Sequence, residues 1–225
     1  MREENLKLKR KHKFIVAADG SAASGKTTGA KKISRKYGLK FLSSGLLYRF
    51  ASYMILKNNP KNKILYTRKI FKKLNYKKLN NLNLHTSEIS EYTSIIAKEK
   101  KIRFILKSFQ KRFANKFNKV CIEGRDIGTV ILPKADVKFF FKCDLNTASK
   151  RRFKELRKKN KQINFKTVKK QIQIRNLRDV SRKNSPLLKS HDAVIVDTGK
   201  LKKIPDMIKK MSEIMDRKII SKYGS

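Results

Sequence analysis

The sequence predicts an α/β fold with three layers, α/β/α, in which helices cover both faces of a parallel central sheet. Short apolar segments with the character of buried strands alternate with longer segments that have helical periodicity. A glycine-bounded loop follows the first apolar segment, and polar clusters follow two others, at residues 123–126 and at residue 144. Because ligands of parallel sheets bind beyond the carboxyl ends of the strands, these three places predict one shared site.

The first element is a strand at residues 14–18, followed by a loop that fits the phosphate-binding pattern G-x-x-x-x-G-K-[ST] at residues 20–27. A helical pattern then runs from residue 27 to about residue 37 and stops at a glycine. This arrangement gathers backbone N–H groups around one concavity, where the helix dipole adds partial positive charge. Lys26 can reach the terminal phosphates of a nucleoside triphosphate there, and Thr27 can bind Mg²⁺. We therefore expect the chain to bind such a nucleotide.

The remaining elements alternate in the same way. A short apolar step at residues 41–42 leads into a mostly helical region that runs to about residue 117. Three further strands then alternate with helices. The expected bounds are helices at 86–97 and 102–117, strands at 120–122 and 137–141, helices at 146–161 and 165–182, a strand at 193–196 and a closing helix.

The formal net charge of +42, from 59 basic and 17 acidic residues, is extreme. Nucleic acid is one partner that such a charge suits. However, the lysines are spread along the whole chain, and Lys, Asn and Ile are abundant together, which favours a biased coding sequence over a dedicated nucleic-acid surface. We therefore expect no specific nucleic-acid partner, but attraction of small polyanions and weak non-specific binding to nucleic acid.

The cellular location is predicted from the apolar segments and the cysteines. No apolar run is long enough to span a membrane, and the charged N-terminus lacks the apolar stretch of a signal peptide. Cys121 and Cys143 lie in apolar, strand-like segments, which suits free buried thiols in a reducing compartment better than a disulfide or a metal site. The expected location is the cytoplasm, with no membrane contact.

One face of the predicted helix at residues 165–182 is strongly charged. Arg175, Arg178, Asp179 and Arg182 follow one another at spacings of three and four, which places them on that face. They form either solvated ion pairs or a set of cations directed at phosphate. Beside a phosphate-binding loop the second interpretation gains weight, because phosphoryl transfer needs cations on the migrating charge.

Two other polar segments also have two interpretations. Gly124, Arg125 and Asp126 form either a strand-ending turn with a local ion pair or a ligand contact, where the glycine lets the backbone approach closely. Ser44 is either the cap of the helix that follows it or part of the site.

Taken together, these segments resemble the cytidylate kinase family, the bacterial-type CMP kinases among the nucleoside monophosphate kinases. The run at residues 123–130 with Pro133 is the most specific match, and the resemblance covers about residues 14–201 in family order. The other matching segments are 19–28, 44–49, 86–97, 151–152, 178–182, 186–187 and 192–198.

The resemblance implies a P-loop nucleoside-kinase fold in a single kinase domain over residues 1–225, acting as a monomer. An insert that closes over the monophosphate is implied at about residues 45–114, and a short lid that closes over the phosphates at about residues 151–165. The core is implied at about residues 12–44, 115–150 and 183–225.

The resemblance also implies the activity. The γ-phosphoryl group of ATP would move to the α-phosphate of CMP or dCMP, with Mg²⁺ as cofactor. Closing of the insert and the lid would exclude water and prevent hydrolysis of ATP.

The family also implies which residues read the base. Ser94, Arg103 and Asp126 would contact cytosine, which offers an amino donor at N4 and acceptors at N3 and O2. A carboxylate accepts from N4, and a guanidinium donates to N3 and O2. Uracil reverses the first two groups, so a buried Asp–Arg pair would face mismatched partners.

The remaining roles implied by the resemblance concern phosphates and sugar. The monophosphate would be held by Arg49 and Arg125, with Ser44 and Tyr48 nearby, the sugar by Arg175 and Asp179, and the phosphate side by Arg182. The ATP phosphates would be held by Arg151, Arg152 and the loop Gly20, Ser21, Ala22, Ala23, Ser24, Gly25, Lys26, Thr27 and Thr28. The implied catalytic residues are Lys26, Arg125, Arg151 and Arg182.

The sequence departs from the family pattern at three places. Ser21 stands where the family usually has proline, and Ser43 where it usually has aspartate. The family usually has glycine after the lysine of the loop, where this chain has Thr27 followed by Thr28, so that either threonine could meet Mg²⁺.

Two alternative functions remain open. One is a related P-loop kinase with another small acceptor such as UMP. The other is a nucleic-acid-binding P-loop ATPase, which the charge suggests but for which the chain leaves little room. A member that binds nucleotide without turnover is disfavoured, because Lys26, Arg125, Asp126 and Arg182 are retained.

Overall fold

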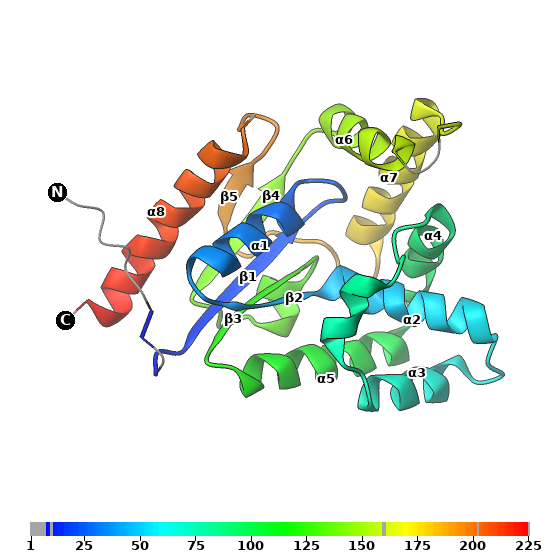
Figure 1. The fold of residues 1–225 in the computed structure, drawn as a ribbon, viewed down its shortest axis with the longest axis horizontal. Coiled ribbons are helices and arrows are strands. Elements are labelled where there is room, and N and C mark those ends of the chain that lie inside the picture. The colour runs from blue at the N-terminus through cyan, green and yellow to red at the C-terminus, as the bar shows by residue number, and fades with distance from the viewer. Residues whose placement is uncertain (1–7, 10, 159–160, 202, 225) are drawn as a thin grey trace.

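The computed structural model describes residues 8–9, 11–158, 161–201 and 203–224, and five parallel strands form the central sheet within them (Figure 1). The strands are β1 (Phe14–Gly20), β2 (Lys40–Ser43), β3 (Lys119–Gly124), β4 (Val137–Lys142) and β5 (Val194–Asp197). The helices are α1 (Lys26–Lys36), α2 (Ser44–Asn58), α3 (Lys63–Lys72), α4 (Ser87–Ile96), α5 (Lys100–Lys116), α6 (Leu145–Arg157), α7 (Phe165–Ser181) and α8 (Ile204–Tyr223). A 3-10 turn, η1 (Tyr76–Asn81), and a π-helical turn, η2 (Ile127–Ile131), complete the order.

The strand order is β2-β3-β1-β4-β5, and all neighbours are parallel, which confirms the predicted sheet. Val16 of β1 lies opposite both Cys121 of β3 and Val137 of β4. The carboxyl ends of these central strands therefore meet at one edge of the sheet. Strand β1 is longer than predicted, because Gly20 still pairs with Phe141 of β4.

Helices cover both faces of the sheet, as the three-layer fold requires. Val16 packs in one core with Ile33 of α1 and Met211 of α8, two helices that lie side by side (Figure 1). The next residue, Ala17, packs in a second core with Leu106 of α5. Successive residues of a strand point to opposite faces, so the run of apolar residues in β1 serves both cores at once.

Helix α2 is capped one residue earlier than expected. Ser43, and not Ser44, is the N-cap, because its Oγ accepts a hydrogen bond from the N–H of Leu46 at 3.2 Å. The same hydroxyl donates to the buried carboxylate of Glu123 at the end of β3. This serine therefore ties the start of α2 to the neighbouring strand.

The structure adds a detail at Gly124 and differs from the prediction at Cys143. A Cβ on Gly124 would stand 2.8 Å from Cδ1 of Ile127 and 3.1 Å from Cβ of Ser44, so this glycine makes room for these two side chains. Cys143 follows β4 instead of lying in it and is only half-buried. Cys121 is buried in β3 as expected, and burial raises the pKa of its thiol to about 12.

Two helical segments flank the carboxyl edge of the sheet. Helices α2 to α5 connect β2 to β3, and α6 and α7 follow β4 (Figure 1). Helix α4 contacts both α2 and α7, so that the two segments meet. The single domain with an insert at about 45–114 and a lid at about 151–165 stays a prediction, and residues 159 and 160 lie outside the described residues.

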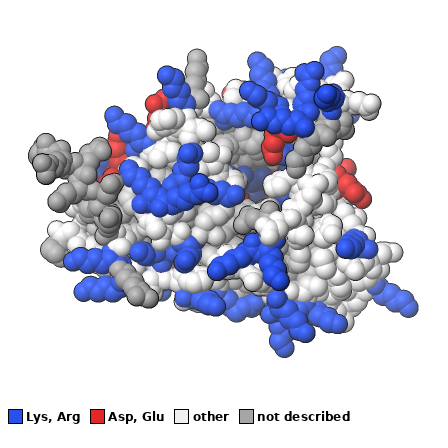
Figure 2. All heavy atoms as spheres, in the orientation of Figure 1, with Lys and Arg blue, Asp and Glu red and all other residues white. Residues whose placement is uncertain are grey.

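Basic side chains are spread over the surface. Figure 2 shows Lys and Arg over most parts of one face, with few acidic side chains among them. Exposed lysines come from α1, α3, α5 and α8, for example Lys32, Lys69, Lys111 and Lys209. Within the described part of the chain, no helix is both long and apolar enough to cross a membrane.

Gly20→Ala is expected to destabilise the fold, because a Cβ there would stand 2.4 Å from the backbone oxygen of Phe141 at a φ of +155°. Overpacking of this kind costs about 1–3 kcal/mol in the free energy of unfolding, which urea denaturation measures. Gly45→Ala in α2 is the matched control, since its Cβ would meet its nearest neighbour at 3.6 Å. Equal unfolding midpoints for the two variants would contradict the packing argument.

Candidate active site

A cavity of about 1080 Å³ opens at the carboxyl edge of the sheet, between the loop after β1 and helices α2, α4, α6 and α7. A smaller cavity of about 50 Å³ adjoins it. Gly45, Ser94, Arg125 and Arg175 border both cavities, so that the two form one continuous site. Side chains from distant parts of the sequence therefore meet at one place.

The loop between β1 and α1 has the geometry of an anion-binding loop. Ala23 and Gly25 have positive φ angles of 54° and 79°. Gly25 is the N-cap of α1 and offers no side chain to the first turn, which leaves the N–H groups there open to an anion. Residues 22–28 border the larger cavity. Gly20 and Ser21 support the loop instead, because Gly20 packs against Phe141 and the backbone oxygen of Ser21 accepts a hydrogen bond from Lys26.

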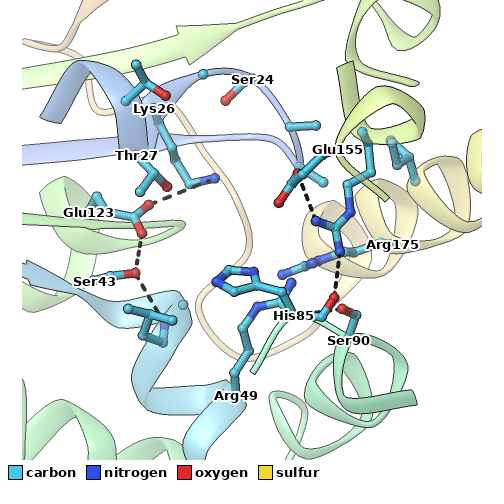
Figure 3. A pocket seen from close by; sticks show the side chains of 18 of the residues that line it. Ser24, Lys26, Thr27, Ser43, Arg49, His85, Ser90, Glu123, Glu155 and Arg175 are labelled. Atoms are coloured by element: carbon cyan, nitrogen blue, oxygen red, sulfur yellow. Dashed lines mark hydrogen bonds and ion pairs between the residues drawn. The ribbon is translucent and has the colours of Figure 1, made fainter. Parts of the chain in front are cut away.

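Lys26 lies in the first turn of α1 and points into the site with its side chain largely buried (Figure 3). Its Nζ donates to the backbone oxygen of Ser21 at 3.1 Å and lies 4.0 Å from Oε2 of Glu123. Burial, followed by the positive charge of Arg125, lowers the pKa of Lys26 to about 7. Because an anion would stabilise the charged form, this lysine is placed to bind phosphate.

Oxygen atoms suited to a divalent cation lie in the same part of the site. Thr27 and Glu123 both border the larger cavity around Lys26 (Figure 3), and Thr28 also borders it. Hydroxyl and carboxylate oxygens are the ligands that Mg²⁺ takes beside nucleotide phosphates. The residues present therefore fit the predicted Mg²⁺.

Three arginines from three elements border the larger cavity, namely Arg49 of α2, Arg125 after β3 and Arg175 of α7. Figure 3 shows the side chains of Arg49 and Arg175 directed into the same space. Burial first, and neighbouring arginines second, lower the pKa of Arg49 to about 9 and that of Arg175 to about 10. The cluster is short of negative charge, which a phosphate group would supply.

The charged face of α7 turns inward, so its interpretation as solvated ion pairs is wrong. Asp179 is only 6% exposed. It accepts a hydrogen bond from Nε of Arg125 at 2.7 Å and lies 3.4 Å from Nη1 of Arg182. Arg178 donates from Nη1 to the hydroxyl of Ser94 in α4 at 2.7 Å.

The smaller cavity is built around a buried ion pair. Nη2 of Arg103 lies 2.5 Å from Oδ2 of Asp126, and both side chains are less than a tenth exposed. The guanidinium of Arg103 also lies over the ring of Tyr48, 5.7 Å from its centroid, and burial raises the pKa of this tyrosine to about 12. Nη2 of Arg182 lies 3.8 Å from Asp126 and has no hydrogen-bond partner among the described residues. The cavity thus offers a carboxylate and two guanidinium groups to a polar ligand.

Arg151 and Arg152 of α6 reach the larger cavity from the other side. Arg151 donates to the hydroxyl and to the backbone oxygen of Thr198, at 2.9 and 2.7 Å. The same hydroxyl bonds the loop after β1, which holds Arg151 beside that loop. Arg152 pairs with Glu155 at 2.9 Å and donates to the backbone oxygen of His85 at 3.2 Å, which links α6 to the segment before α4.

The structure brings the predicted residues together at the two cavities, apart from the two that support the loop. The larger cavity is bordered by residues 22–28, Arg49, Arg151 and Arg152, the smaller by Ser44, Tyr48, Arg103, Asp126, Asp179 and Arg182, and both by Ser94, Arg125 and Arg175.

Sequence reasoning assigned no individual role to three residues that shape the site, namely Asp19, Glu123 and Thr198, and it treated Arg178 only as one of the cations on its helix face. Asp19 accepts hydrogen bonds from the N–H groups of residues 127 and 128 at 2.8 and 2.7 Å, and burial raises its pKa to about 6. The signal for Asp19 and Glu123 was present, because acidic residues are rare in this chain and both stand at the ends of buried strands.

Comparison with known proteins identifies similar chains over most of the sequence. A family model described as cytidylate kinase matches residues 16–217. A cytidylate kinase of Bartonella tribocorum is 39% identical over 193 residues, covering 84% of this chain and 88% of the relative. One of Thermosipho melanesiensis is 35% identical over 213 residues, covering 90% and 97%. One of Clostridium tetani is 32% identical over 223 residues, covering 94% and 98%.

Binding of ATP at about pH 8 is expected to be accompanied by proton uptake at Lys26. Because the pKa of Lys26 is about 7 in the free protein, its amine is mostly neutral at that pH, and a bound triphosphate restores the charged form. Isothermal titration calorimetry in two buffers with different ionisation enthalpies measures the uptake. Lys26→Met should take up fewer protons than the wild type, and equal uptake by both proteins would contradict this role of Lys26.

Proposed function

The chain belongs to the cytidylate kinase family, and from this premise we propose that it transfers the γ-phosphoryl group of ATP to CMP or dCMP within the two joined cavities. The phosphates of ATP occupy the loop after β1 and the larger cavity. The base of the acceptor occupies the smaller cavity. The observation that carries this assignment is the buried ion pair of Arg103 and Asp126, whose hydrogen-bonding groups match cytosine.

Base recognition follows from the donors and acceptors of this pair. Asp126 accepts a hydrogen bond from the N4 amino group, and Arg103 donates to N3 and O2. Uracil has a carbonyl at position 4 and an N–H at position 3, so both groups would face a partner of the wrong kind. An unpaired charge in a buried site is costly, which makes the pair selective for cytosine.

Phosphate binding follows from the convergent cations. Lys26 and the N–H groups of the loop hold the phosphates of ATP, and Arg49 and Arg125 hold the phosphate of the acceptor, with planar bidentate contacts from the guanidinium groups. Bound to Thr27 and Glu123, Mg²⁺ would neutralise charge on the β- and γ-phosphate oxygens.

Catalysis by this site consists of positioning and electrostatic stabilisation. Lys26, Arg125, Arg151 and Arg182 supply positive charge to the migrating group. Arg151 is held in place for this by its two hydrogen bonds to Thr198.

The sugar and the closed state are assigned to contacts between helices. Arg175 and Asp179 of α7 contact the sugar. The hydrogen bonds from Arg152 to His85 and from Arg178 to Ser94 join the two helical segments over the cavity, which supports their role in excluding water. The chain acts as a monomer in the cytoplasm, where free thiols such as Cys121 and Cys143 persist.

Membership of the family does not favour a nucleic-acid-stimulated ATPase. The net charge of +42 still attracts polyanions without specificity. A UMP kinase is disfavoured for a separate reason, since the Arg103–Asp126 pair complements cytosine.

The activity is tested by ADP release from Mg-ATP with CMP, dCMP, UMP, AMP or no acceptor, each with and without RNA. We expect release to depend on CMP or dCMP and to be unaffected by RNA. Lys26→Ala, prepared in the same way, controls for contaminating kinases, and its rate should fall by about 10²–10³-fold. Release that needs no acceptor but responds to RNA would contradict the proposed function.

Asp126→Ala is expected to lower the ratio of kcat/KM for CMP to that for UMP by about tenfold or more, because the acceptor for N4 is lost. Both constants are measured on one preparation, so the ratio does not depend on how much of the variant is folded. Asp206→Ala, which removes an exposed carboxylate from α8, should leave the ratio unchanged. An unchanged ratio in Asp126→Ala would remove this residue from base recognition.

A further inference from the structure

The hydroxyl of Ser94 takes part in two hydrogen bonds whose directions are fixed by their partners. It donates to the backbone oxygen of Glu91 at 2.8 Å, since a carbonyl can only accept. It accepts from Nη1 of Arg178 at 2.7 Å, since a guanidinium can only donate. A serine hydroxyl has one proton and two lone pairs, so one lone pair of Ser94 remains for a ligand.

Ser94 lies where the two cavities join. The residue is 7% exposed and borders both cavities, so a ligand in either can reach its hydroxyl. The bond to the oxygen of Glu91 holds the proton of Ser94, and the bond from Arg178 holds the Ser94 oxygen in place from the side of α7. The hydroxyl can then accept a hydrogen bond from a ligand but cannot donate one without breaking a bond that is already formed.

Arg178 differs in its partner from the other arginines around Asp179. Arg125, after β3, and Arg182, at the end of α7, each pair with Asp179, whereas the hydrogen bond of Arg178 crosses from α7 to the hydroxyl on α4. Its donor group therefore acts on a side chain of the smaller cavity.

We propose that Arg178 is a positioning residue that sets the choice of base by holding Ser94 as an acceptor. The inference rests on the proposed function and deepens it. The N4 amino group of cytosine has two hydrogens, of which Asp126 takes one and Ser94 the other. Uracil presents a carbonyl oxygen at the same place, which would face a lone pair of Ser94 instead of a proton and would bind poorly. Arg178 thus adds selectivity without touching the base.

The test compares kcat/KM for CMP and UMP in the wild type, Arg178→Met and Arg178→Lys. In Arg178→Met the Ser94 oxygen keeps only its bond to Glu91 and is held less firmly beside N4. This weakens the contact with cytosine but not with uracil, so we expect the ratio of CMP to UMP to fall by about tenfold. The change should appear mainly in KM, because Arg178 is not assigned to the migrating phosphate. Arg178→Lys keeps a cationic donor and should restore most of the ratio.

Two controls separate this role from a structural one. Lys170→Met removes one charge from the exposed surface of the same helix and should leave the ratio unchanged. In a Ser94→Ala background, Arg178→Met should no longer change the ratio, because the side chain through which it acts is absent.

Three outcomes would overturn the inference. Arg178→Met could lower kcat/KM for CMP and UMP by the same factor, its effect on the ratio could persist in Ser94→Ala, or Lys170→Met could lower the ratio equally. Each of these is compatible with a wild type that phosphorylates CMP, and then only the role of Arg178 fails. A wild type without CMP-dependent release of ADP would overturn the proposed function itself.

Discussion

Buried positive charge without enough carboxylates to balance it is the constraint on which the site depends. Lys26, Arg49 and Arg175 converge on one cavity, and burial together with repulsion from cations such as Arg125 lowers the pKa of each. Between about pH 7 and the usual lysine pKa of 10.5, the unfolded chain binds a proton at Lys26 that the folded chain does not hold. This residue therefore makes the fold less stable at neutral pH, and its contribution improves as the pH rises through that range. A bound phosphate group offsets this destabilisation, because it supplies the missing negative charge.

The frame that keeps these charges close together consists of contacts between strand ends. Asp19 at the end of β1 binds two backbone N–H groups of η2, and Ser43 joins the end of β2 to Glu123 at the end of β3. Thr198, after β5, joins the loop after β1 to Arg151. Parallel strands end at one edge of the sheet, so a few short side chains can connect all of these segments.

The few acidic residues in the site contrast with the strongly basic surface. The chain has only 17 carboxylate side chains, yet Glu123, Asp126 and Asp179 are all buried beside the two cavities. Each of these carboxylates pairs with a cationic side chain there. The pair orients the cation, whose remaining N–H groups can bind a ligand. The surface charge acts over longer distances and without specificity, because exposed charges are screened by salt.

The sequence by itself determined the features that depend on neighbouring residues. The loop from Gly20 to Thr27, the alternation of strands and helices, and the charged face of α7 are local patterns, and a residue's neighbours in the chain are enough to recognise them. Only the tertiary structure decided which of these faces meet. The bond from Arg178 to Ser94 joins residues 84 positions apart, and the bond from Ser43 to Glu123 joins residues 80 apart. The packing role of Gly124 and the extension of β1 to Gly20 also depend on contacts with distant segments. Such contacts are set by how helices and strands pack in three dimensions, which no local pattern of residues encodes.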